Sequence, residues 1–150
     1  MHISEIINEN LICLELMSPT KHSVIFELVQ ILEQENVITS TKSFLEDVIE
    51  RENLSSTGIG YGIAIPHAKS RFVKKPALVF GRSEKGIDFQ SMDHEKAYLF
   101  FMIAMPEEGS NAHLKILAEL SRKLMKESFR DALMHADSKK EVLAYLIKET

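Results

Sequence analysis

An unbroken apolar run, AYLFFMIAMP (Ala97–Pro106), constrains the fold of this 150-residue chain more than any other feature. The run carries no charged residue and does not alternate apolar with polar positions, so as a strand it is buried on both faces. A sheet with such a strand needs helices on each side. The run is also too short to cross a membrane as a helix, which takes roughly 18 or more apolar residues.

Other segments supply the remaining strands and the helices. Strands are predicted at residues 10–17, 58–65 and 76–83, and a turn-rich connection follows from residue 84. One helix begins at Ser18 or Thr20 and places Val24, Leu28, Ile31 and Leu32 at helical spacing. A second spans residues 40–53, with Phe44, Leu45, Val48 and Ile49 on one face.

Three more helices close the chain, starting near Ser110, near Ser128 and at Ser138, where Glu141 completes a capping-box spacing. No linker or internal repeat divides the sequence. We therefore expect one α/β (α+β) domain over residues 1–150, folded as a three-layer αβα sandwich with a central mixed sheet flanked by helices.

Composition excludes several classes of function. The formal net charge is −4 and the basic residues form no stripe, which argues against a nucleic-acid partner. No segment has the length and apolarity for direct membrane insertion, and the first ten residues do not resemble a signal peptide. The single cysteine, Cys13, stands in the apolar run LICLEL and is interpreted as a buried hydrophobic residue. Together these features favour a cytoplasmic protein.

The segment GIGYGIAIPH is the most unusual local pattern. If it forms one strand, one face carries almost no side chains and lets another backbone approach, whereas the other belongs to the core and carries Ile59, Tyr61, Ile63 and Ile65. Pro66 lacks an N–H and is expected to end the strand or to place it at a sheet edge. The pattern therefore predicts that His67 is exposed on a rigid support.

The glycines do not form a nucleotide-binding loop. Ile63 occupies the place of the last glycine in G-x-G-x-x-G, and the phosphate-loop pattern G-x-x-x-x-G-K-[ST] is absent from the sequence. His67 is instead a candidate for phosphoryl chemistry, because Lys69 and Arg71 lie nearby and His113 stands in the first turn of a predicted helix. A helix N-terminus stabilises a phosphate and favours a neutral histidine.

Three stretches carry a resemblance to a known family: residues 51–70 (REN…STGIGYGIAIPHAKS), 77–93 (ALVFGRSEKGIDFQSMD) and 113–125 (HLKILAELSRKLM). They resemble the fructose/mannitol-type enzyme IIA component of the bacterial phosphoenolpyruvate-dependent sugar phosphotransferase system, and the resemblance covers nearly the whole chain. The segments FGRSEKGIDF and LFFMIAMPEEG are more similar to the fructose branch than to the mannitol branch.

The resemblance implies a role for three residues. His67 would be phosphorylated on Nε2, His113 would be the second active-site histidine, and Arg51 would help to hold the phosphoryl group. It also implies the phosphocarrier HPr as donor and a cysteine of a IIB domain as acceptor, with transfer to a sugar, fructose by this resemblance, during uptake through IIC. No metal or cofactor is implied.

Alternatives remain open from the sequence. A nitrogen-type regulatory IIA protein would be phosphorylated at the same histidine but would act by binding other proteins. A metal hydrolase using His67 and His113 lacks a third ligand at suitable spacing. His113 could be a plain helix-cap residue and Arg51 a solvated helix-end cation. The other histidines are expected at the surface: His2, His22, His94 and His135. Lys69 and Arg71 are expected either at the rim of a docking surface or as solvated residues, and Glu107 and Glu108 are expected in a solvated turn.

Overall fold

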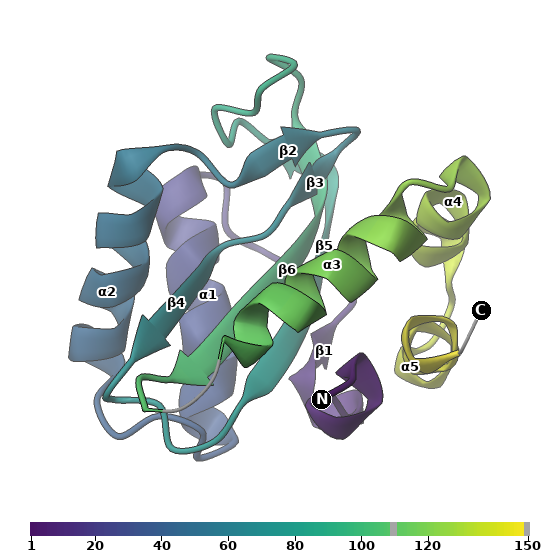
Figure 1. Ribbon diagram of the computed structural model, residues 1–150. Coiled ribbons are helices and arrows are strands. Elements are labelled where there is room, and N and C mark those ends of the chain that lie inside the picture. Colours follow the sequence, from purple (N-terminus) through teal and green to yellow (C-terminus); the bar gives the residue numbers. More distant parts are fainter. Residues whose placement is uncertain (109–110, 149–150) are drawn as a thin grey trace.

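A mixed six-stranded sheet forms the middle layer of the protein in a computed structural model that describes residues 1–108 and 111–148 (Figure 1). Its strands are β1 (Ile12–Cys13), β2 (Gly58–Gly60), β3 (Ile63–Ala64), β4 (His67–Ser70), β5 (Ala77–Ile87) and β6 (Ala97–Pro106). The order is β1-β5-β6-β3-β2, and β4 also pairs with β6. The pair β5–β6 is antiparallel, whereas β1–β5, β3–β6 and β4–β6 are parallel.

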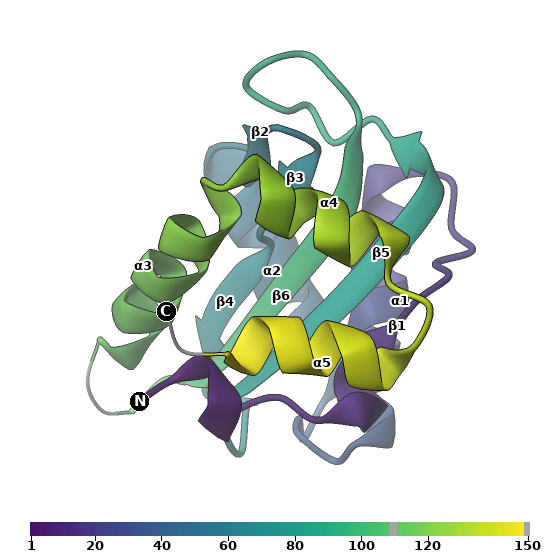
Figure 2. The same ribbon diagram turned by 90° about the vertical axis from the view of Figure 1, so that its right-hand side faces the viewer.

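Helices cover both faces of this sheet. One face is covered by α1 (Lys21–Gln34) and α2 (Thr41–Leu54), and the other by α3 (Ala112–Leu124), α4 (Glu127–His135) and α5 (Lys139–Ile147) (Figures 1 and 2). Two short 3₁₀ turns, η1 (Ile3–Glu5) and η2 (Glu9–Leu11), precede β1. The predicted three-layer αβα architecture with a mixed sheet is confirmed.

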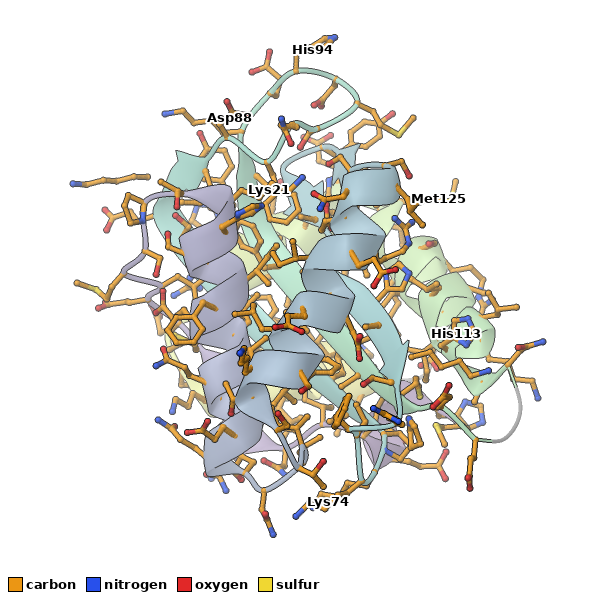
Figure 3. All side chains as sticks on the ribbon, turned by 90° about the vertical axis from the view of Figure 1, so that its left-hand side faces the viewer. Lys21, Lys74, Asp88, His94, His113 and Met125 are labelled. Atoms are coloured by element: carbon orange, nitrogen blue, oxygen red, sulfur yellow. The ribbon has the colours of Figure 1, made fainter. Side chains whose placement is uncertain are left out.

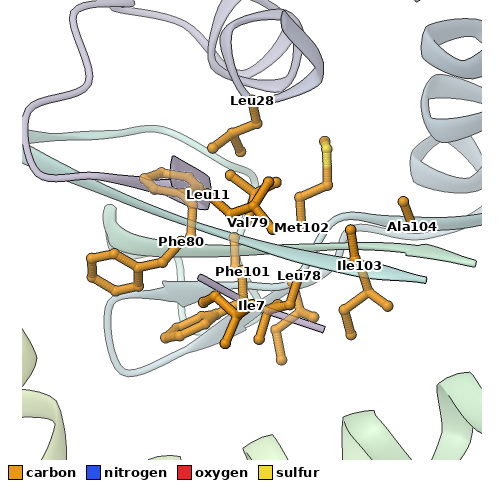
Figure 4. Packing of buried hydrophobic residues seen from close by; sticks show 14 of the residues in the cluster. Ile7, Leu11, Leu28, Leu78, Val79, Phe80, Phe101, Met102, Ile103 and Ala104 are labelled. Atoms are coloured by element: carbon orange, nitrogen blue, oxygen red, sulfur yellow. The ribbon is translucent and has the colours of Figure 1, made fainter. Parts of the chain in front are cut away.

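The central strand is buried on both faces, as its composition predicts. In the β5–β6 pair, Val79 lies opposite Met102 and Leu78 lies opposite Ile103. Figure 4 shows Val79 and Met102 on the side of Leu28 from α1, with Leu78 and Ile103 on the opposite side. The sheet therefore holds apolar side chains on each face, and each helical layer packs onto one of them.

Capping hydrogen bonds mark the starts of α1 and α5. Of the two candidates for α1, Thr20 is the cap, and its hydroxyl accepts the Ser23 N–H at 3.3 Å. Ser138 likewise accepts the Glu141 N–H at 3.1 Å before α5. Ser110, near which we expected the next helix to begin, lies outside the described residues. The described helix α3 follows Asn111, whose side chain makes no capping hydrogen bond.

The prediction of one continuous strand over residues 58–65 is wrong. The chain reverses at Tyr61 and Gly62, so β2 and β3 form an antiparallel hairpin. Gly60, Tyr61 and Gly62 all have positive φ angles (96°, 58° and 78°), which the two glycines adopt without strain. Tyr61 at the tip is 76% exposed and Ile59 is 39% exposed, whereas Ile63 is buried as expected.

Pro66 interrupts the sheet ladder without ending it. β3 and β4 lie on either side of Pro66, and both pair with β6 in parallel. The Pro66 carbonyl accepts the Ile103 N–H at 3.0 Å, which ties the break to the central strand. His67 is therefore the first residue of a new strand, where we expected it to follow the end of one.

Two other strand boundaries differ from expectation. β1 contains only two residues of the predicted 10–17, because a 3₁₀ turn occupies residues 9–11 and the chain is irregular from residue 14 to residue 17. β5 continues to Ile87, so the turn-rich connection begins later than predicted. Within the described part of the chain, no helix combines the length and the apolarity needed to span a bilayer.

Candidate functional site

His67 is fixed at the start of β4 by a hydrogen bond from its own ring. Nδ1 lies 2.8 Å from the carbonyl oxygen of Ile65. A carbonyl oxygen only accepts hydrogen bonds, so Nδ1 carries the proton and the neutral ring keeps its free lone pair on Nε2. The ring is partly buried and lines a surface groove. The backbone thus selects which nitrogen is available as a nucleophile.

The surroundings of His67 disfavour its charged form. Burial lowers the pKa of the imidazole below its ordinary value, and the positive charge of Arg51 lowers it further. The hydrogen bond to Ile65 and the charge of Glu52 act in the opposite direction, but the net shift is downward. His67 is therefore neutral at pH 7, the state in which Nε2 can attack an electrophile.

The groove brings the three predicted site residues together. It has a volume of about 750 Å³ and is lined by residues of α2, β4 and the start of α3, including Arg51, His67 and His113. These positions span more than sixty residues of sequence. Figure 3 shows the labelled His113 on α3, to the side of α2. The side chains thus come from three elements that meet at one edge of the sheet.

Arg51 lies in the last turn of α2, as the sequence predicts. Its Nη1 donates a hydrogen bond of 2.9 Å to the carbonyl oxygen of Ser55, which holds the guanidinium against the chain leaving the helix. A cation is favoured at a helix C-terminus by the helix dipole. Guanidinium groups also bind phosphate oxygens through paired N–H donors, so Arg51 suits an anion in this groove.

His113 is held less firmly than His67. It is the second residue of α3, and its Nδ1 is buried with no hydrogen-bond partner among the described residues. Its pKa is lowered, first by burial and then by the charges of Lys69 and His67. The expected preference for the neutral ring is therefore present. Because this Nδ1 is shielded from solvent, it reaches a ligand in the groove only if the ring turns, whereas the residue itself already lines the groove.

Sequence reasoning missed a polar pair in the wall of the groove. The Ser70 hydroxyl donates to Oδ2 of Asp47 at 2.6 Å and accepts the N–H of Phe72 at 3.1 Å. Ser70 is buried, and the pair joins the end of β4 to α2. Asp47 is four residues before Arg51, and this spacing alone places the two side chains on one helix face. The spacing was the available signal.

The charged residues near the motif also line the groove. Lys69 and Arg71 are exposed there, and the Arg71 guanidinium lies 4.8 Å from the ring centre of Phe72. Glu107 lines the same groove. The remaining histidines are exposed, which confirms their predicted surface positions: His2, His22, His94 and His135.

In the part of the chain that the structure describes, neither Cys13 nor a metal site contributes to the groove. Cys13 packs against the core but is only partly buried, and burial raises the pKa of its thiol. Across residues 1–108 and 111–148, no cluster of three or more His, Cys, Asp or Glu side chains is arranged to hold a metal ion. The metal-hydrolase alternative therefore has no ligand set in this part of the chain.

Comparison with known proteins gives a family match over most of the sequence. Residues 5–149 match the family described as "Phosphoenolpyruvate-dependent sugar phosphotransferase system, EIIA 2". A Haloferax volcanii protein, "PTS system fructose-specific EIIA component", is 43% identical over 93% of this chain and 91% of its own length. The Bacillus subtilis "PTS system fructose-specific EIIABC component" is 42% identical over 95% of this chain. This chain spans only 22% of that longer relative.

Solved structures give the same result. The nitrogen regulatory protein IIA-Ntr of Neisseria meningitidis has a TM-score of 0.90 and 33% identity, covering 96% of this chain and 98% of its own. The Escherichia coli complex of enzyme IIAMTL with phosphorylated enzyme IIBMTL matches with a TM-score of 0.81 and 26% identity. That match covers 93% of this chain and 96% of the matched one.

Proposed function

This chain belongs to the EIIA 2 family of the phosphoenolpyruvate-dependent sugar phosphotransferase system, and on that premise we propose that it is a phosphocarrier whose phosphoryl group is held on His67. The observation that carries the proposal is the ring geometry. Nδ1 of His67 is occupied by the Ile65 carbonyl, which leaves Nε2 as the nucleophile in a groove shared with Arg51 and His113.

The proposed reaction exchanges one bond to phosphorus for another. The Nε2 lone pair of His67 attacks the phosphorus of phosphorylated HPr, a P–N bond forms on His67, and the P–N bond in the donor breaks. A cysteine thiolate of a IIB domain then attacks the same phosphorus, and the His67 P–N bond breaks. Each transfer needs in-line positioning and stabilisation of charge, and the residues named here supply both without a metal.

Charge stabilisation is assigned to Arg51 and His113. A phosphoryl group on the ring carries a charge of about −1.5 to −2. One cation at about 4 Å contributes roughly 4 kcal/mol of attraction per unit charge at an effective dielectric of about 20, before desolvation. Arg51 supplies this charge from the end of α2, and His113 supplies a hydrogen-bond donor from α3.

A IIB domain is the proposed acceptor, and fructose is the proposed sugar. The B. subtilis relative is named as an EIIABC component, and a distant relative of known structure was solved in complex with phosphorylated IIBMTL. The relatives at 42% and 43% identity are named fructose-specific. We assign transport of a sugar through a IIC partner on the same basis.

A regulatory role is the second candidate, because the protein from N. meningitidis that matches with a TM-score of 0.90 is named a nitrogen regulatory protein. In that case phosphorylation would control binding to another protein and no IIB domain would accept the phosphate. The higher identity to fructose-specific relatives favours the transport role.

Labelling tests the proposal. The protein is incubated with phosphoenolpyruvate, enzyme I and HPr, and one acid-labile phosphoryl group is expected, mapped by mass spectrometry to His67. Addition of a fructose-type IIB domain should then move the label to the IIB cysteine. Label on another residue rejects the assignment of His67, whereas a stable label that no IIB domain accepts favours the regulatory role.

A further inference from the structure

Glu52 is an ionisable side chain that the proposed chemistry does not use, although it follows Arg51 directly on α2. It is only 4% exposed, whereas Arg51 lines the groove. A buried carboxylate is strongly unfavourable unless it is paired. Its partner is Lys21 from the first turn of α1, with Nζ 3.0 Å from Glu52 Oε2. Lys21 also lies 4.8 Å from the ring centre of Phe89.

Both carboxylate oxygens of Glu52 reach Thr57. Oε2 accepts the Thr57 N–H at 3.1 Å, and Oε1 accepts the Thr57 hydroxyl. Thr57 is 5% exposed and stands between α2 and β2. Hydrogen bonds to a charged acceptor are roughly twice as strong as neutral ones. The buried ion pair therefore fixes Thr57 through both its backbone N–H and its side-chain hydroxyl.

A line of hydrogen bonds continues from Thr57 to the imidazole. The Thr57 carbonyl accepts the Ile65 N–H at 3.0 Å, which extends the hairpin ladder past the Gly58–Ala64 pair. The Ile65 carbonyl in turn accepts the proton of His67 Nδ1 at 2.8 Å. These bonds hold Thr57 and Ile65 in fixed positions, so the ion pair acts through the backbone on the carbonyl that selects the tautomer of His67.

We propose that Glu52, paired with Lys21, is a positioning residue that holds the Ile65 carbonyl in place and thereby keeps His67 in the tautomer with Nε2 unprotonated. The consequence for phosphoryl transfer rests on the proposed function, but the effect on the ring does not. Lys21 has a second role in this arrangement, because it neutralises a carboxylate that would otherwise oppose a negative phosphoryl group on His67.

The tautomer is measured by ¹⁵N NMR of the unphosphorylated protein at pH 7.5. Wild type is expected to show His67 almost wholly with Nδ1 protonated. In Glu52→Gln and in the double variant Lys21→Met/Glu52→Gln, we expect ring-nitrogen shifts that reveal a mixture of both tautomers. Phosphoryl transfer from HPr should slow by about tenfold. Thr57→Val keeps the backbone bonds and removes only the hydroxyl, so a smaller tautomer shift and a fall in transfer rate of about threefold are expected.

Arg82→Met is the matched control. Arg82 is half-buried and donates to the carbonyl oxygens of Leu133 and Ala136 at 2.9 and 2.8 Å, so its loss destabilises the fold away from His67. It should leave the tautomer and the transfer rate as in wild type, at a temperature where the protein is folded.

Glu52→Gln alone leaves Lys21 unpaired, and that variant could fail to fold. In that case the double variant and Thr57→Val still test the inference. Folded variants of Glu52 or Thr57 with an unaltered His67 tautomer would overturn the inference. A wild-type protein that accepts no phosphoryl group would instead reject the proposed function and leave the tautomer result standing.

Discussion

The two histidines of the groove are held by very different means. His67 begins a strand, and the residues before it are tied by main-chain bonds to Thr57 on one side and to Ile103 on the other. Its Nδ1 is also occupied. His113 stands in the first turn of α3, where the N-cap makes no side-chain bond and Nδ1 has no partner within the described residues.

This difference indicates a division of labour. A nucleophile must present one nitrogen in a fixed direction, because phosphoryl transfer depends on in-line geometry. A group that stabilises the transferred phosphoryl oxygens gains from a ring without a fixed partner, which is able to turn and form its bond only when the ligand is present. His67, at the start of β4, suits the first task, and His113, in the first turn of α3, suits the second.

Replacing the fixed ring should have the largest effect. His67→Ala removes the nucleophile, so labelling from HPr should be lost entirely. The free energy of unfolding should change by about 1–2 kcal/mol at most, since one hydrogen bond to a backbone carbonyl is lost. Labelling and thermal denaturation of the same sample check both parts. A variant that still accepts the label, or that unfolds outright, contradicts the proposed role of His67 as the nucleophile.

Removing the positive charge of Arg51 should have the next largest effect. Arg51→Ala should slow transfer by roughly 10–100-fold, the equivalent of about 1.5–3 kcal/mol for a charged hydrogen bond. Arg122→Ala is the matched control, because Arg122 is an exposed arginine in the last turn of α3. Rapid-quench measurement of transfer from HPr compares them. Equal rates for the two variants would remove Arg51 from the mechanism.

The less constrained of the two rings is tested at His113. His113→Ala should slow transfer by about 2–10-fold, since one neutral hydrogen bond of about 0.5–1.5 kcal/mol is lost, and His113→Gln should restore part of the rate. His22→Ala is the control, because His22 is also the second residue of a helix and is exposed. A loss as large as that of His67→Ala would show that the two rings are equally essential.

The smallest effect is expected in the pH dependence of stability. The pKa of His67 is lowered in the folded protein, so below about pH 6.5 the unfolded chain binds more protons. Stability should therefore be complete above that pH and decrease as the pH falls from it toward the lowered pKa. Denaturant titrations of wild type and His67→Asn from pH 8 to pH 5 check this. A wild-type advantage that grows on acidification would mean that the folded ring prefers its charged form.

Local patterns predicted the fold better than they predicted the hairpin. The run at 97–106 and the helix faces, such as Phe44 with Val48 on α2, encode burial directly through their spacing. GIGYGIAIPH led to a wrong prediction because its alternation of small and large residues fits one long strand as well as two short strands joined by a turn. The positive φ angles of Gly60 and Gly62 that reverse the chain leave no trace in that alternation.

The site was predicted in part for a similar reason. The sequence predicted His67, His113 and Arg51 as site residues, and the structure places all three in one groove. Their chemical roles stay proposals. The sequence provided no indication that Glu52 is buried, because a glutamate beside an arginine near a helix end has the pattern of a solvated residue.

The buried central strand, the helices that cover it and the motif around His67 follow from the order of the residues, since burial periodicity and capping depend on neighbouring residues. Two features became visible only in the folded protein: which nitrogen of His67 is free, and the pairing of the buried Glu52 with Lys21. Those contacts join residues from different elements, and their geometry depends on how the elements pack, which no local pattern specifies.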